Sequence, residues 1–197
     1  MTLEPMQSSP LVSQLGSSDP GERFAALAGL SDLAADSYGA DATHLAAVLR
    51  EAGGIDTLVR HMEDPAADVQ QCAMSLVGNL LTDVFDPEAR TSLNLFAKAG
   101  GLPVLQKKLH AEFPINLFAA AALQNVTALD PEDCCAALRE LGADSDLAGL
   151  AQNDNEQVRK RAACALTLRH KSTCTRPRPQ EQVRCARAHS TAAVAPP

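Results

Sequence analysis

The chain has 197 residues, of which 46% are hydrophobic but only 3% aromatic, and its formal net charge at pH 7 is −7. No stretch approaches the ~18 consecutive apolar residues of a transmembrane helix, and the first residues lack the basic and apolar segments of a secretory leader. We therefore expect no membrane span and no leader, and a core of alanine and leucine on packed helices.

The first predicted elements, in chain order, are a short helix and a long one. The short helix carries Leu11 and Leu15 on its inward side, and the long helix covers residues 24–33 (FAALAGLSDL). The long segment places apolar residues at helical spacing. Leu11 and Leu15 lie 47 residues before Leu58 and Met62, the inward residues of a later helix. The N-terminal part is therefore expected to be the end of a truncated leading repeat.

The next predicted unit contains three helices. A short first helix over 45–52 is followed by Gly53-Gly54, a second helix with Leu58 and Met62 inward, and a long third helix over 71–80 (QCAMSLVGNL). Paired glycines end one helix and turn sharply into the next, because glycine adopts a positive φ without strain.

The same order returns twice more. It comprises first helices over 93–99 and 135–141, breaks at 100–101 and 141–143, and third helices over 117–126 and 160–168. Aligning the long helices on Asp32, Asn79, Asn125 and Leu168 gives steps of 47, 46 and 43 residues. A period of about 40–47 residues is typical of helical solenoids, whose units are stable only when stacked.

The turn sequences EAGGIDTLVRHMED and KAGGLPVLQKKL, followed by long helices ending in GNLL and QNV, resemble armadillo repeats. The resemblance covers about residues 11–169 and implies an all-α, right-handed α-solenoid of about three and a half three-helix repeats. HEAT-type helix pairs are the nearest alternative, and three helical segments per period disfavour them. The expected divisions are a partial N-terminal capping repeat (1–16), armadillo repeats 1 (17–64), 2 (65–111) and 3 (112–153), a partial C-terminal repeat (154–170) and a tail (171–197).

Armadillo proteins use the third helices as a concave binding surface, so the resemblance implies a protein-binding groove there. Gln71, Ser75 and Asn79 are spaced by four, opposite the apolar stripe, and so share one helix face. By the resemblance, Asn79 and Asn125 match the asparagines that hold the main chain of an extended peptide, Asp32 is an acidic substitute and Leu168 departs from the pattern. The predicted partner-binding residues are Asp32, Gln71, Ser75, Asn79, Asn125 and Lys160. An asparagine late in a helix can instead cap or solvate that helix, and the sequence leaves this alternative open.

Two features of the sequence restrict the class of partner that we expect. Nuclear-import adaptors of this family carry tryptophan four residues before each asparagine, where this chain has Ala28, Ser75, Ala121 and Cys164, so an import receptor is disfavoured. Residues 17–157 carry 22 acidic and 8 basic residues, whereas residues 158–197 carry 9 basic and 1 acidic. An acidic solenoid repels nucleic acid and favours a basic or extended protein segment, although the charge can also serve solubility alone.

The residue patterns of enzymes are missing from the sequence. It has no G-x-S-x-G or H-E-x-x-H motif and no glycine-rich phosphate loop, and its six cysteines match no standard zinc spacing. We therefore expect no catalysis, cofactor or metal, and a reducing location, the cytoplasm first and the nucleus second. The adjacent Cys134 and Cys135 lie at a predicted helix start, where a helix dipole can lower the pKa of a thiol, but packing between repeat helices explains at least one of them more simply.

The sequence thus favours a non-enzymatic adaptor or scaffold. The second candidate is a nucleotide-exchange factor of the armadillo class that acts on an Hsp70-type chaperone. A third candidate is a fragment of a longer repeat array. Arg161 argues against it, because it stands where Cys72 and Phe118 pack in earlier repeats, and such a polar replacement suits a terminal cap. The tail over 171–197 has five basic residues and no apolar periodicity, so we expect it to be disordered, either solvated or docked on the acidic solenoid.

Overall fold

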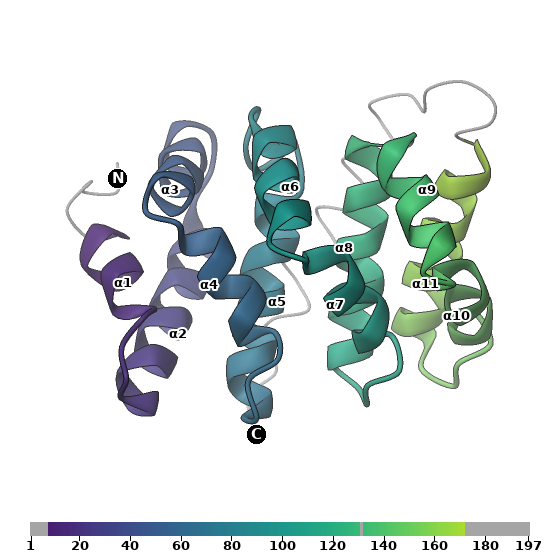
Figure 1. The fold of residues 1–197 in the computed structure, drawn as a ribbon, viewed down its shortest axis with the longest axis horizontal. Helices are drawn as coiled ribbons and strands as arrows, with labels where there is room; N and C mark the ends of the chain where they lie inside the picture. The colour runs from purple at the N-terminus through teal and green to yellow at the C-terminus, as the bar shows by residue number, and fades with distance from the viewer. Residues whose placement is uncertain (1–7, 131, 172–197) are drawn as a thin grey trace.

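The computed structural model describes residues 8–130 and 132–171, and within these ranges it contains eleven α-helices and no strand (Figure 1). The helices are α1 (Ser8–Gln14), α2 (Pro20–Asp36), α3 (Ala40–Glu51), α4 (Gly54–His61), α5 (Ala67–Leu80), α6 (Ala89–Lys98), α7 (Gly101–Lys108), α8 (Ile115–Leu129), α9 (Asp133–Glu140), α10 (Ala143–Leu150) and α11 (Glu156–Lys171). The predicted tail lies outside the described residues apart from Lys171, which ends α11.

The helices form a solenoid in which a leading pair, α1–α2, is followed by three triplets, α3–α5, α6–α8 and α9–α11. The long third helices α2, α5, α8 and α11 lie side by side in one layer, and the first and second helices cover one side of that layer (Figure 1). The prediction of an all-α solenoid is confirmed. Its core is small-residue packing: leucine and alanine dominate the buried side chains, and Phe96 is the largest that is fully buried.

The glycine breaks place the second helices. Gly53, Gly100 and Gly142 adopt φ values of 68°, 82° and 79°, so each joins its two helices through a left-handed residue. The next residue, Gly101, is constrained by packing, because a Cβ atom on it would lie 2.3 Å from the Phe96 ring. The third repeat has Ala143 at that position, where the smaller Leu138 occupies the place of Phe96.

The first helices are longer than their apolar pattern predicted. Helix α3 has 12 residues and starts at Ala40, whereas the pattern indicated 45–52; the second helices have 8 residues each. The extra turn, Ala40–His44, is mostly small and polar, and so carries no apolar period that reveals a helix.

A buried ion pair joins consecutive repeats. Arg50, in the last turn of α3, pairs with Asp86 in the loop before α6; the Asp86 side chain is fully buried and that of Arg50 is 9% exposed. Arg50 also donates to Ser92 Oγ at 3.1 Å and to Glu88 Oε2 at 3.3 Å. Because both partners are withdrawn from water, the pair costs desolvation energy and requires this hydrogen-bonded geometry.

Candidate binding face

The third helices have one side that no other described helix covers. This side, called the third-helix face from here on, consists of the outward residues of α2, α5, α8 and α11. It is marked by Phe24, Asp32, Gln71, Ser75, Asn79, Asn125 and Lys160, which are exposed or half-buried. The predicted binding residues thus come from four parallel neighbouring helices on one side of the solenoid (Figure 1).

The α5 residues of this face have unused polar groups. Gln71 is exposed, while Ser75 and Asn79 are half-buried, and these three make no side-chain hydrogen bond to any described residue. Asp32, on neighbouring α2, is exposed. The Asn79 amide therefore offers one acceptor and two donor hydrogens to a ligand.

Asn125 is used differently. Its Nδ2 donates a 2.8 Å hydrogen bond to the backbone carbonyl of Gly78 on α5. Helix α5 ends at Leu80, so Gly78 is among the last residues of the helix, whose carbonyls lack an intrahelical N–H partner. Asn125 thus caps the preceding third helix across the repeat boundary, and retains one N–H and its carbonyl oxygen for other contacts.

Helix length explains why Asn79 does not do the same. The carbonyl 47 residues before Asn79 belongs to Asp32, and α2 continues four residues further, to Asp36. The Asp32 carbonyl therefore lies inside a continuing helix, where the N–H of the fourth following residue bonds it. Asn79 has no orphan carbonyl to cap, which leaves its amide available.

The C-terminal end of the face is more self-contained. Lys160 pairs at 2.6 Å with Glu156 one turn earlier, and this contact lowers the pKa of the exposed Glu156 carboxyl. Arg161 turns toward α8, where its Nη1 lies 3.4 Å from Gln124 Oε1. Lys160 remains a predicted contact, whereas Arg161 joins α11 to α8 as a terminal repeat requires.

Small residues line the middle of the face. The row that precedes the asparagine positions by one turn contains Ala28, Ser75, Ala121 and Cys164, none larger than a thiol. Ala121 is 5% exposed, and its neighbours Ala119, Ala120 and Ala122 are fully buried, because α11 packs along α8. The middle of the third-helix face is therefore lined by short side chains beside the available polar groups of α5.

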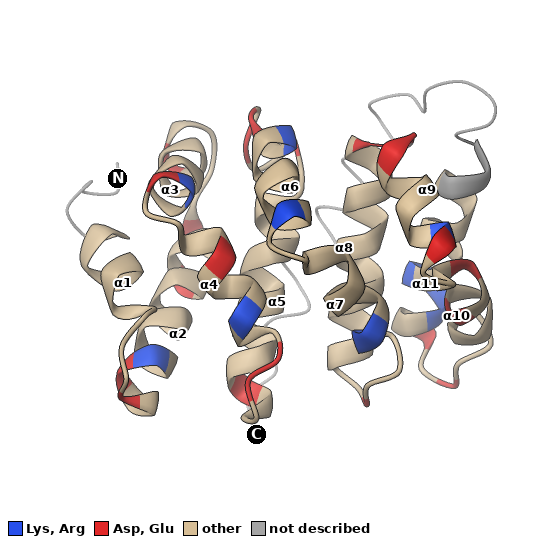
Figure 2. Cartoon of the chain, viewed as in Figure 1, with Lys and Arg blue, Asp and Glu red and all other residues tan. Residues whose placement is uncertain are grey.

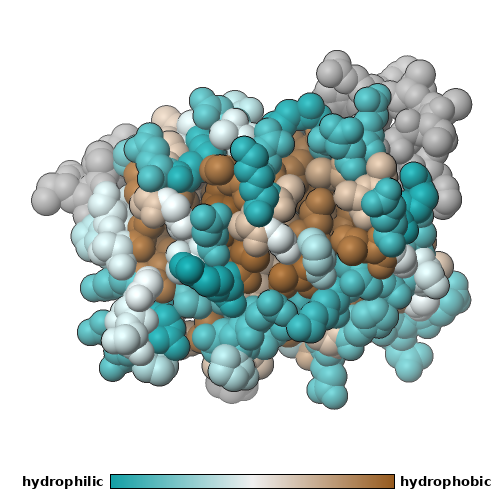
Figure 3. All heavy atoms as spheres, in the orientation of Figure 1, coloured by the Kyte–Doolittle hydropathy of each residue, from teal (hydrophilic) through white to brown (hydrophobic). Residues whose placement is uncertain are grey.

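Charge is uneven around this face. Acidic residues lie at both the upper and the lower edge of the molecule in Figure 2, and some of them are at the C-terminal ends of the third helices or in the loops that follow. Asp36 and Asp83 are exposed there and make no ion pair with a described residue, whereas Asp130 lies 3.9 Å from Arg90. The opposite side of the molecule, built from first and second helices, shows apolar atoms in its middle between polar side chains (Figure 3).

The pKa values of two cysteine thiols, Cys134 and Cys72, are raised. Burial, followed by the charge of Asp130, raises the pKa of Cys134 to about 11, as the packing interpretation of this cysteine implies and opposite to a lowering by the helix dipole. Burial also raises the pKa of Cys72. Desolvation of the thiolate outweighs the dipole of α9, which has only 8 residues.

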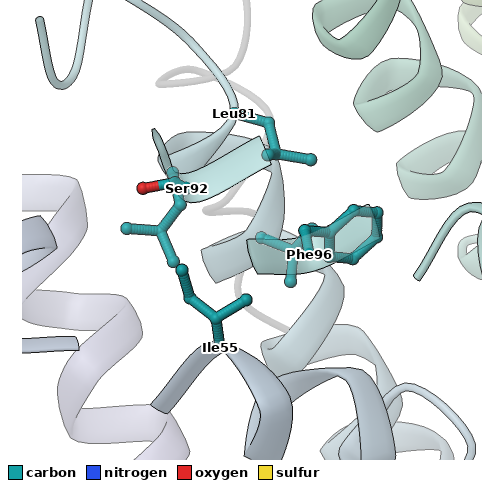
Figure 4. A pocket seen from close by; sticks show the side chains of 6 residues that line it. Ile55, Leu81, Ser92 and Phe96 are labelled. Atoms are coloured by element: carbon teal, nitrogen blue, oxygen red, sulfur yellow. The ribbon is translucent and has the colours of Figure 1, made fainter. Parts of the chain in front are cut away.

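A narrow crevice lies between α4, α5 and α6. The crevice lined by Ile55, Leu81, Ser92 and Phe96 has no room for a water molecule (Figure 4). Within residues 8–130 and 132–171, no three His, Cys, Asp or Glu side chains are grouped so as to hold a metal ion, and no helix is both long and apolar enough to cross a membrane.

Searches of protein-family models and of curated proteins each return no match. Among solved structures, the chain is similar to computationally designed armadillo repeat proteins for modular peptide recognition, with 28% identity and a TM-score of 0.68, over 81% of this chain and 63% of that one. It is also similar to a designed armadillo repeat protein in complex with the peptide (KR)4, with 24% identity and a TM-score of 0.68, over 82% and 63% of the two chains. An engineered protein has 24% identity and a TM-score of 0.71, over 92% and 67%.

The chain thus spans less than two thirds of the length of the two armadillo designs. The likeness extends over most of this chain and agrees with the helix order, the glycine turns and the layer of third helices. The chain therefore has the armadillo-repeat fold.

Proposed function

We propose that the chain is a non-catalytic scaffold that binds an extended protein segment along the third-helix face. The observation that carries this proposal is the available Asn79 amide, which lies in line with Gln71 and Ser75 on α5, a helix that packs beside α2 with its exposed Asp32. An amide side chain pairs with the N–H and C=O of an extended backbone, so it holds a peptide with little regard to sequence.

Two further points support an extended and basic ligand. The designed proteins of similar fold are described as binding peptides, one of them (KR)4. The exposed carboxylates of Asp32, Asp36 and Asp83 favour cationic side chains beside the peptide backbone. Asp32, Gln71, Ser75 and Asn79 are the proposed direct contacts, Asn125 contributes its remaining amide groups, and Lys160 lies at the C-terminal end.

The test is a titration of the full chain with fluorescently labelled (KR)4 peptide at low salt, using an (ED)4 peptide as the charge control. Asn79→Ala is expected to weaken binding by about 3- to 10-fold, the value of one hydrogen bond. Asp32→Lys is expected to weaken it further and to reduce the salt dependence. Matched controls are Asn94→Ala on α6 and Asp56→Lys on α4, exposed residues of the first and second helices. Equal losses in the control variants, or no binding of (KR)4, would contradict the proposal.

The chaperone-cofactor reading is tested in parallel by nucleotide release from an Hsp70. A scaffold of the proposed kind leaves the release rate unchanged. Release that the full chain accelerates, and that Asn79→Ala does not alter, would contradict the peptide-groove proposal, because a cofactor grips a whole domain rather than an extended segment.

A further inference from the structure

We propose that the C-terminal segment 172–197 is an internal ligand of the third-helix face and competes there with external peptides. The proposal rests on the proposed function of this face and adds a regulatory partner to it, namely the chain itself. Its elements are the position at which the segment begins, a row of carboxylates along one edge of the face, and the composition of the segment.

The segment begins on the face that it would cover. Helix α11 is the last third helix and ends at Lys171. Because the four third helices run in the same direction, this end lies at the same edge as the C-terminal ends of α2, α5 and α8 (Figure 1). The segment therefore starts beside the third-helix face and needs no path around the molecule to reach it.

A carboxylate recurs at this edge once per repeat. Asp36 ends α2, Asp83 follows α5 and Asp130 caps α8, at intervals of 47 residues. The partial negative charges at the C-terminal ends of these helices add to the row. Arg90 lies 3.9 Å from Asp130, so the two carboxylates without an ion pair to a described residue, Asp36 and Asp83, carry the attraction.

The segment complements this row. Its 26 residues contain four arginines and a single acidic residue, Glu181. The arginines are Arg176, Arg178, Arg184 and Arg187. Prolines at 177 and 179 favour an extended backbone, the form that the Asn79 amide is suited to hold.

The segment is long enough to reach the whole row of carboxylates, and its tether to α11 favours docking. Neighbouring packed helices lie about 10 Å apart, so the end of α2 is about 30 Å from the end of α11. Twenty-six extended residues reach up to about 85 Å. Because the segment is tethered, its effective concentration at the face is of millimolar order, so weak contacts are enough to populate the docked state. An external peptide then has to displace it.

The test is limited trypsinolysis of the full chain, followed by mass spectrometry, at the bonds after Arg184 and Arg187. Docking protects these bonds, and cleavage follows the undocked fraction. In low salt, the double variant Asp36→Asn/Asp83→Asn is expected to be cut about fivefold faster than the wild type, the value of two exposed ion pairs. The matched control is Asp56→Asn/Glu112→Gln, which removes two exposed charges elsewhere. Equal cleavage of the wild type and the Asp36/Asp83 variant, or equal acceleration by the control, would overturn the proposal.

A second readout separates this proposal from the function of the face. Replacing the four arginines by glutamine in the full chain is expected to tighten (KR)4 binding several-fold. If the segment is protected in the wild type but the arginine-to-glutamine variant does not bind (KR)4, docking is supported and the external-peptide function is refuted. If the wild type and the variant bind (KR)4 equally, and the wild-type segment is not protected from trypsin, docking is refuted and the function of the face is left intact.

Discussion

Asn125 donates its side-chain amide to the carbonyl of Gly78, and this 2.8 Å bond joins the third helices of two consecutive repeats. The carbonyl of Gly78 is free to accept this bond because α5 ends two residues later. The residue pattern thus places two asparagines at equivalent positions, and the ends of the neighbouring helices give them different roles. One caps a helix, and the other has its amide available.

The two asparagines are therefore expected to separate stability from binding. Asn125→Ala removes the cap from α5 and should lower the free energy of unfolding by about 1 kcal/mol. Asn79→Ala loses no bond to a described residue and should leave stability within about 0.5 kcal/mol while weakening (KR)4 binding. Urea unfolding and peptide titration of both variants check this. If Asn79→Ala proves the more destabilising, these roles are wrong.

The Arg50–Asp86 pair predicts that substituting Asp86 destabilises the chain far more than substituting its neighbour Glu88. Asp86→Ala leaves the nearly buried Arg50 guanidinium without its main partner and should cost about 3 kcal/mol or more. Glu88→Gln removes a contact whose carboxylate side is 68% exposed and should cost under about 1 kcal/mol. Urea unfolding of the two variants measures the difference; similar small losses would show that the buried pair contributes little.

At the turn before α7, we expect a steric clash on substitution of Gly101 that a second substitution, at Phe96, relieves. Gly101→Ala forces a Cβ atom against the Phe96 ring and should destabilise the chain by about 2 kcal/mol. Adding Phe96→Leu recreates the Leu138–Ala143 combination of the third repeat and should cost less than the two single changes together. Thermal unfolding of the double-mutant cycle tests this, with Gly78→Ala as a control because a Cβ there meets no atom within 4 Å. A strictly additive cycle would argue against the clash.

Cys134 predicts a loss of stability at high pH. Its folded pKa is raised to about 11 from an ordinary value of 9.0, so the folded state favours the protonated thiol. This contribution is complete below pH 9 and is lost as the pH rises from 9 to about 11. The free energy of unfolding, measured with urea across this pH range, should fall more steeply for the wild type than for Cys134→Ala. Parallel curves would mean that the thiol is not desolvated, as would alkylation of Cys134 in the folded chain at the rate of an unfolded thiol.

Much of the fold was predictable because repetition amplifies weak signals. Each third helix shows several turns of apolar residues at helical spacing, and the glycine turns recur at intervals of 47 and 42 residues, so an ambiguous signal in one copy is resolved by the next. The prediction was weakest where this signal is missing. The first turn of α3, from Ala40, consists mostly of small and polar residues and lies outside the predicted first helix, 45–52.

The sequence by itself determined the helices, their order and the side of each third helix that faces solvent, because these follow from spacing within a single segment. Only the tertiary structure decided which polar groups are already used. Asp86 lies 36 residues from Arg50, and Asn125 lies 47 residues from Gly78, so neither contact has a local signal. Both depend on where a neighbouring helix ends and on how closely the next repeat packs. A contact between repeats is therefore decided by the stacked fold, whereas the shape of each repeat is decided within its own residues.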